Sequence, residues 1–106
     1  MSVAALIKNP QDLDAEDFYI PIASELVFEK KWKPIIEELN FQWLPLFSTG
    51  VNIEKIDLNN VLNELSDFRA LYIKKFGIDD LVSRVDLLSD SLVKVFKRGD
   101  VIVFIG

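Results

Sequence analysis

Two long segments in the second half of the chain carry apolar residues at helical spacing. Before the first, Asp57 can accept hydrogen bonds from the free amides of a first helical turn, and Ile56 and Val61 have the spacing of a hydrophobic staple. Gly77 favours a left-handed stop after Phe76. We therefore expect a helix from Asp57 to Phe76. Its buried stripe is Leu58, Val61, Leu62, Leu65, Phe68, Leu71, Tyr72 and Phe76.

The second segment predicts another helix, which Asp79 or Asp80 caps and Gly99 ends. Cations in its last turns stabilise the negative end of the helix dipole. These cations are Lys94, Lys97 and Arg98. The apolar stripe is Leu81, Val85, Leu88, Leu92, Val95 and Phe96.

A shorter helical stripe runs from Phe28 through Trp32 to Leu39, and Pro34 interrupts it. Inside a helix, proline removes one hydrogen bond and crowds the carbonyl of Lys30. Either the helix is kinked at Pro34 or its regular part begins there. Because the stripe begins before the proline, a kinked helix is favoured.

Three segments have the pattern of strands. Residues 18–22 alternate, and Pro21, which cannot donate to a ladder, predicts an edge position. The aromatic residues 41–47 can pair as a hairpin with residues 51–53. Residues 101–105 are wholly apolar, which is typical of a central strand covered on both faces.

These elements predict a single α+β domain over residues 1–106, with residues 1–17 as an acidic N-terminal extension or loop. Three main helices would pack on a small mixed or antiparallel sheet. The N-terminus has no charged front end and no clear cleavage site, so a signal peptide is not expected. No apolar run reaches the roughly 18 residues that span a bilayer. We therefore expect a cytoplasmic protein with no membrane partner.

Composition removes most catalytic chemistry, because the chain has no Cys and no His. Disulfides, thiolate zinc sites, cysteine nucleophiles and imidazole bases are excluded. Seventeen acidic residues outnumber twelve basic ones, for a formal net charge of −5. That charge repels a phosphate backbone, and the basic cluster at residues 30, 31 and 33 is short, so nucleic-acid binding is not expected.

Paired carboxylates are the remaining enzymatic option, and the nearest pairs are Glu37–Glu38, Asp79–Asp80 and Asp86–Asp90. Glu37 and Glu38 are adjacent on a helix, where side chains diverge by about 100°. Asp79 and Asp80 precede a helix, where carboxylates act as caps. Asp86 and Asp90 are one helical turn apart, and carboxylates on such a face are commonly solvated. The alternating acids at residues 12, 14 and 16 lack the central glycine and distal glutamate of a calcium loop. We predict no catalytic, cofactor-binding or metal-binding residue and no enzyme activity.

Carboxylates on exposed helix faces can instead attract a basic protein partner. The predicted partner-binding residues are Glu64, Asp67, Asp79, Asp80, Asp86 and Asp90.

Three stretches carry a family resemblance: WKPIIEEL at residues 32–39, WLPLFSTG at residues 43–50 and VLNEL at residues 61–65. With them, residues 20–71 resemble small bacterial immunity proteins of the polymorphic-toxin and contact-dependent growth inhibition type. The resemblance implies a cytosolic protein that binds a cognate toxin domain, commonly a basic nuclease, and blocks its active site.

An alternative hypothesis is a homo-oligomeric structural or regulatory interaction domain without catalytic activity. Such a domain, for example a homodimer, would associate through residues 101–105 at a sheet edge or through the aromatic residues 41–47. An enzyme with two carboxylates converging in an apolar cleft is a third hypothesis.

Overall fold

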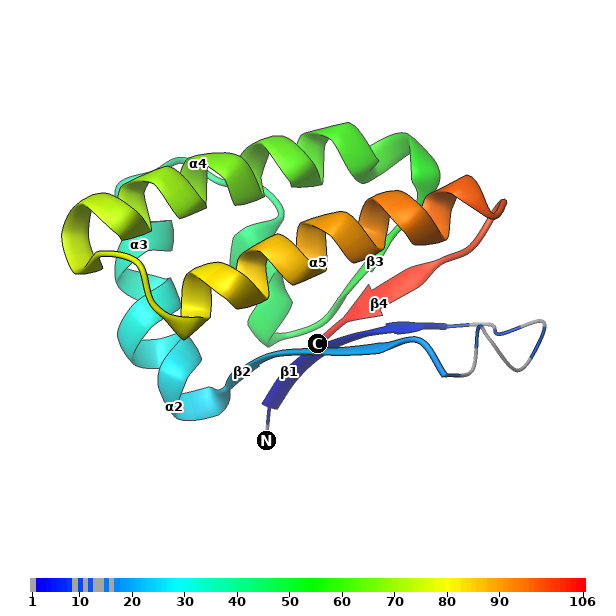
Figure 1. Ribbon diagram of the computed structural model, residues 1–106, viewed down its shortest axis with the longest axis horizontal. Helices are drawn as coiled ribbons and strands as arrows, with labels where there is room; N and C mark the ends of the chain where they lie inside the picture. The colour runs from blue at the N-terminus through cyan, green and yellow to red at the C-terminus, as the bar shows by residue number, and fades with distance from the viewer. Residues whose placement is uncertain (1, 9, 11, 13–14, 16) are drawn as a thin grey trace.

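The computed structural model describes residues 2–8, 10, 12, 15 and 17–106. It has two layers, a four-stranded antiparallel sheet and a layer of helices on one of its faces (Figure 1). The predicted α+β class is therefore confirmed. The elements are β1 (Ser2–Ile7), β2 (Tyr19–Ser24), α2 (Glu25–Val27), the π-helical turn η1 (Phe28–Trp32), α3 (Lys33–Glu38), the 3-10 helix η2 (Leu44–Ser48), β3 (Val51–Ile53), the 3-10 helix η3 (Lys55–Asp57), α4 (Leu58–Phe76), α5 (Asp80–Lys97) and β4 (Val103–Ile105).

The sheet has the strand order β2-β1-β4-β3, so β2 is an edge strand and β4 is central, as predicted. The prediction that residues 1–17 form an extension or loop is wrong for residues 2–7, which form the other central strand, β1. Residues 2–7 do not alternate between apolar and polar positions, so their sequence alone does not indicate a strand. They form one by pairing with β2 and β4. Residues 9, 11, 13, 14 and 16 of the predicted acidic loop lie outside the described residues.

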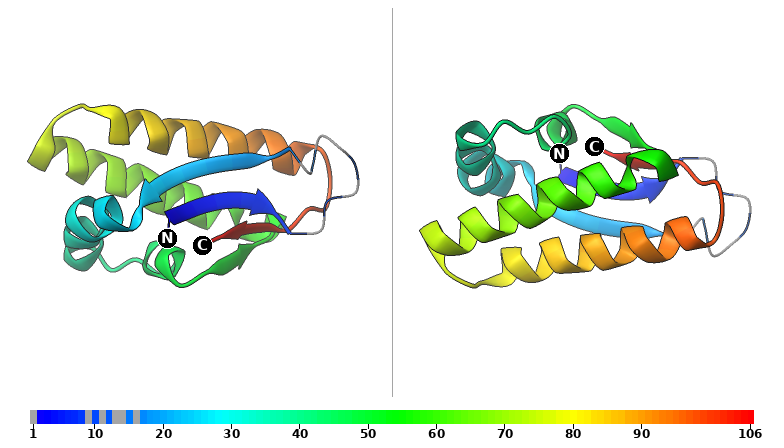
Figure 2. Two further views of the ribbon diagram at one scale, coloured as in Figure 1. Left: turned by 90° about the horizontal axis from the view of Figure 1, so that it is seen from below. Right: turned by 90° about the horizontal axis from the view of Figure 1, so that it is seen from above.

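The helices cover one face of the sheet only, as the views from below and from above show (Figure 2). On the covered face, Ile7, Val103 and Ile53 are paired across three strands and are all buried. The prediction that residues 101–105 are covered on both faces is therefore wrong, because Phe104 on the opposite face is only partly buried. Burial of alternate residues on one side was sufficient to make this segment a central strand.

The helices α4 and α5 form an antiparallel hairpin close to the predicted bounds, and the predicted stripe of α5 is buried throughout. Of the stripe predicted for α4, Val61, Leu65, Phe68 and Tyr72 are buried, Leu58, Leu62 and Leu71 are partly buried, and Phe76 is 45% exposed. Gly77 ends α4 with a φ of +84°, a conformation that favours glycine. Two details at the start of α4 differ from the prediction. The Asp57 carboxylate turns back to accept a hydrogen bond from the amide of Glu54 at 3.1 Å. Ile56 is 86% exposed and makes no staple, because η3 turns it away from the core.

The helical run around Pro34 is continuous from α2 through the π-helical turn η1 to α3, and the regular helix α3 begins at Lys33 with Pro34 in its first turn, which is the second of the two predicted alternatives. The amide of Lys33 donates to the carbonyl of Phe28, five residues back. This wider turn lies directly before Pro34, which has no amide to donate and stands in the first turn of α3, where a proline is tolerated. Trp32, in the same turn, is fully buried and stacks on Phe68 of α4 with ring centroids 4.2 Å apart.

The strand predicted for residues 41–47, and its hairpin with residues 51–53, are wrong. Residues 44–48 form η2, with Leu44 and Phe47 fully buried. Pro45 favours the first turn of a helix over a ladder position, and β3 instead pairs with β4. Within the described chain, no helix is both long and apolar enough to cross a membrane.

Candidate interaction surface

The outer seam between α4 and α5 is closed by an ion pair. The guanidinium of Arg69 donates from Nε to Oδ1 of Asp86 at 2.7 Å and from a terminal nitrogen to Oδ2 at 3.2 Å. The hydrogen bonding to Asp86, together with the negative charge of Asp86, raises the pKa of Arg69 above its usual value. Asp86 therefore sits on the predicted surface, but with its charge partly neutralised from within the protein.

Asp79 has a structural role at the connection between the two helices. Its Oδ1 accepts from the amide of Leu81 at 2.9 Å and caps α5, as predicted, while its Oδ2 accepts from the Tyr72 hydroxyl at 2.7 Å. The hydrogen bond from Tyr72 lowers the pKa of Asp79 below its usual value. Burial, together with the hydrogen bond to Asp79, raises the pKa of Tyr72 to about 12.

Glu64 also has a structural role. Its carboxylate accepts from three consecutive backbone amides, those of Gln42 at 3.0 Å, Trp43 at 2.9 Å and Leu44 at 3.1 Å. These amides lead into η2, where no residue of that helix is available to pair with them. Glu64 thus fastens the segment before η2 to α4.

Asp67, Asp80 and Asp90 are exposed, and within the described part of the chain they have no ion-pair or hydrogen-bond partner. They do not lie together. Asp67 is one turn from Glu64, on the flank of α4 that faces residues 42–44. Asp80 is in the first turn of α5, and Asp90 follows Asp86 by one turn.

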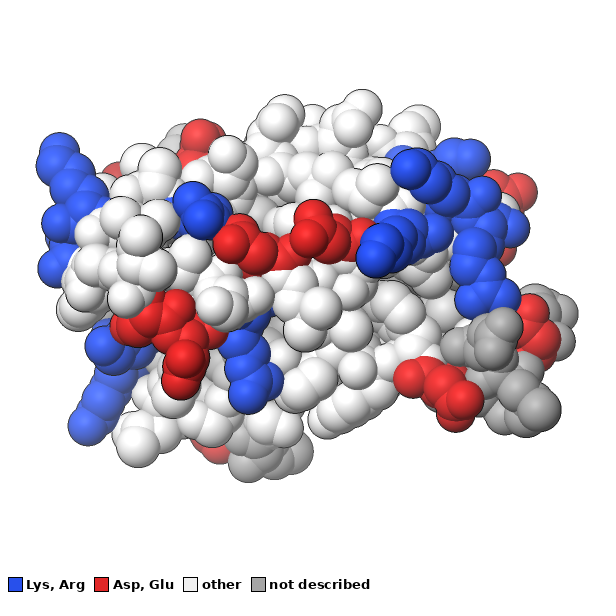
Figure 3. Space-filling model, viewed as in Figure 1, with Lys and Arg blue, Asp and Glu red and all other residues white. Residues whose placement is uncertain are grey.

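The structure therefore does not gather the six predicted residues into one patch. On the face that α4 and α5 present, acidic side chains gather along the seam, with Lys and Arg near both ends of the molecule (Figure 3).

One exposed apolar residue on α5 was not predicted. Leu87 lies outside the buried stripe and is 50% exposed. On a helix Leu87 neighbours Asp90 at a spacing of three, and Asp86 neighbours Asp90 at a spacing of four. The sequence did contain a signal for this exposed position, because Leu87 is an apolar residue out of phase with the buried stripe of α5. We call Asp86, Leu87 and Asp90 the α5 ridge.

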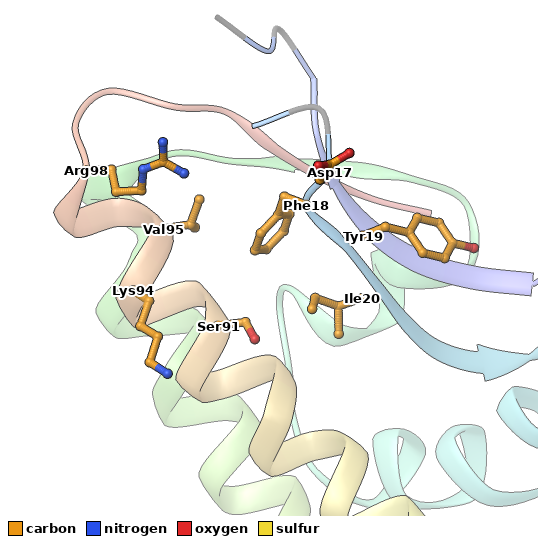
Figure 4. A pocket seen from close by; sticks show the side chains of 8 residues that line it. All are labelled: Asp17, Phe18, Tyr19, Ile20, Ser91, Lys94, Val95 and Arg98. Atoms are coloured by element: carbon orange, nitrogen blue, oxygen red, sulfur yellow. The ribbon is translucent and has the colours of Figure 1, made fainter. Parts of the chain in front are cut away.

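A hollow of about 310 Å³ lies between the start of β2 and the C-terminal half of α5. Figure 4 shows Phe18 and Ile20 directed toward α5, whereas Tyr19 points the opposite way. Arg98 at its rim pairs with Asp12 at 3.3 Å. Among the described residues, no hydrogen bond joins the Ser91 hydroxyl in this hollow to another side chain. Its lining is Asp17, Phe18, Tyr19, Ile20, Ser91, Lys94, Val95 and Arg98.

Among the described residues, no group of three or more Asp or Glu side chains is placed to hold a metal ion. Comparison of the chain with protein-family models, with curated proteins and with solved structures finds no match.

Proposed function

We propose that the protein is an immunity-type inhibitor that binds a cognate bacterial toxin domain through the α5 ridge. The observation that carries this proposal is the exposed, unpaired carboxylate of Asp90 beside the half-exposed Leu87 on a rigid helix hairpin. The sequence resemblance to immunity proteins points to the same class. The proposed compartment is the cytoplasm, where such an inhibitor would meet its toxin.

The ridge combines two features that protein recognition uses. A carboxylate attracts a basic partner over a distance and fixes its orientation, and an exposed leucine supplies an apolar anchor at short range. A nuclease that binds a phosphate backbone has a basic site. Occupying that site with the acidic ridge would exclude the nucleic acid substrate, so inhibition requires no catalytic group in this chain.

The test is affinity capture from the native host with the immobilised full chain, followed by co-expression. We expect the chain to retain one basic protein, whose expression alone stops bacterial growth and whose co-expression with this chain restores it. Asp90→Lys should weaken the complex, and more strongly at low salt, because screening then no longer masks the charge reversal.

Asp100→Lys is the matched control, since Asp100 is exposed, lies outside the ridge and receives the same change of charge. Equal loss of binding in both variants would show that only net charge matters. A retained protein that is harmless to growth, or whose binding is indifferent to ionic strength, would contradict the proposal.

A further inference from the structure

The sheet face opposite the helices carries an uncharged row that is apolar on β2, β1 and β4 and ends in Asn52 on β3. Leu6 pairs with Tyr19 on one side and with Phe104 on the other, and Phe104 pairs with Asn52. This row crosses all four strands, and Figure 2 shows no helix over it among the described residues. Tyr19 is 56% exposed and Leu6 is 37% exposed. The row is therefore accessible.

This face also lacks charge. As the structure describes them, the four strands contain no Asp, Glu, Lys or Arg, although 27% of the chain is charged. A solvated face of an antiparallel sheet normally alternates polar residues with the buried ones. Here the outward positions are mostly apolar, which is the composition of a face that another surface covers.

Phe104 makes the face flat. Its ring lies over two glycines, so that a Cβ built on Gly50 would be 3.0 Å from the ring and one built on Gly106 would be 2.7 Å from it. Only residues without side chains allow the ring to lie along the sheet in this way. A flat sheet face packs well against a second sheet face at about 10 Å.

The sheet edges are less suited to association. On the free side of β2, Arg84 of α5 donates to the carbonyl of Pro21 at 3.0 Å, and Pro21 has no amide to offer a new strand. The other edge strand, β3, has only three residues. Short or blocked edges disfavour strand addition. The alternative that residues 101–105 pair at an edge is wrong, since β4 is central. In the segment 41–47, Leu44 and Phe47 are fully buried, whereas Gln42, Pro45 and Leu46 are exposed.

We propose that this uncharged sheet face packs against the same face of a second copy of the chain. Two molecules that each carry a net charge of −5 repel one another, and this repulsion costs least where the faces in contact carry no charge, as in the strands. A two-fold axis brings the same row to both sides of the contact. A second copy thus supplies a surface that is likewise uncharged and mostly apolar.

The size of the face predicts a reversible dimer. At about 4.8 Å between strands and about 3.3 Å per residue, the four strands present roughly 300 Å² of projected area per copy. Stable interfaces bury about 1,200 Å² or more in total, and the two faces together provide about half of that, so we expect a weak dimer that dissociates on dilution.

The inference is independent of the proposed function. In a face-to-face pair, the α4–α5 layers of both copies point outward, so both α5 ridges stay accessible (Figure 2). The dimer can therefore fail while toxin binding holds, and the reverse.

The test is sedimentation equilibrium of the full chain from about 5 to about 500 µM, a range chosen to follow a weak dimer on dilution. We expect the average mass to rise from 12.1 kDa toward twice that value. Tyr19→Lys should weaken the dimer at least about tenfold, because an unpaired charge is then buried in each half of an apolar contact. Added salt should strengthen it by screening repulsion between acidic copies.

Ile78→Lys is the matched control, since Ile78 is 78% exposed in the turn between α4 and α5 and should leave the dimer constant unchanged. Asn52→Lys, at the other end of the row, serves as the second variant, and circular dichroism verifies that each variant is folded. A wild-type chain that stays at 12.1 kDa throughout overturns the proposal. A dimer that both folded row variants leave intact also overturns it.

Discussion

Tyr72 and Asp79 tie the two long helices together where they connect. The hydroxyl of Tyr72, in the last turns of α4, donates a 2.7 Å hydrogen bond to the residue that caps α5. The Tyr72 side chain is fully buried, whereas Asp79 is exposed, so the bond joins the core to the helix cap.

This relationship predicts how stability depends on pH. The pKa of Tyr72 is raised from 10.0 to about 12, so its contribution to stability is complete below pH 10 and is lost as pH rises toward 12. The pKa of Asp79 is lowered, so its contribution is complete above its usual pKa of 3.8 and is lost as pH falls below that value.

Tyr72→Phe isolates the first effect. At neutral pH we expect the free energy of unfolding to fall by about 0.5–1.5 kcal/mol, the net value of one hydrogen bond. The difference between wild type and variant should shrink between pH 10 and pH 12. Urea unfolding across this range measures it, with Tyr19→Phe as the control. A constant difference over that range would show that Tyr72 ionises equally in the folded and unfolded chain.

Glu64 provides a second prediction, because it accepts from three backbone amides. Glu64→Ala leaves those amides unpaired and should cost about 1–3 kcal/mol. Glu64→Gln, which keeps one acceptor oxygen, should cost less. Hydrogen exchange at residues 42–44 should accelerate in the same order. Asp67→Ala, on the same helix flank, should change stability by less than about 0.5 kcal/mol, and equal losses at both positions would refute the bracing role of Glu64.

Most of the helical layer could be predicted from sequence because its signals are local. The stripe of α4 and its glycine stop depend only on residues in or next to α4, and the Asp79 cap depends only on residues in or next to α5. Residues 2–7 and 41–47 were not predicted correctly, because their conformation depends on distant partners. Glu64, twenty residues from Leu44 in sequence, accepts a hydrogen bond from the amide of Leu44, the first residue of η2.

The candidate surface was predictable only in part for the same reason. Sequence spacing placed Asp86 and Asp90 on one helix face, as the structure does. It could not reveal that Arg69 neutralises Asp86 across the helix pair, or that Tyr72 and three backbone amides occupy two other carboxylates. Partners that far apart in sequence become visible only in the folded chain.

Gly50 tests the packing of Phe104. Gly50 has a φ of +109°, and a Cβ there would lie 3.0 Å from the Phe104 ring. Gly50→Ala should therefore cost about 1–3 kcal/mol in backbone strain, plus a steric contribution. Gly77→Ala has comparable strain at a φ of +84° but meets nothing within 4 Å. Thermal unfolding should show the larger loss for Gly50→Ala, and Phe104→Ala in that background should remove the excess. If the two glycine variants unfold alike, the ring does not rest on Gly50.

Trp32 combines the tightest aromatic packing with an unpaired donor. Its ring is fully buried against Phe68, 4.2 Å away, and against Phe28, 5.6 Å away. Among the described residues, its indole Nε1–H has no hydrogen-bond acceptor. A buried donor without an acceptor costs about 1–3 kcal/mol, which offsets part of what the ring contributes.

Trp32→Phe removes that unpaired group together with one ring of the indole. We therefore expect it to lower the free energy of unfolding by less than about 1.5 kcal/mol, because the two effects oppose one another. Phe68→Ala, which opens the same stack without removing a polar group, should cost about 3–5 kcal/mol. Urea unfolding of both variants makes the comparison. A loss in Trp32→Phe as large as that in Phe68→Ala would mean that the indole N–H does find a hydrogen-bond partner in the folded protein.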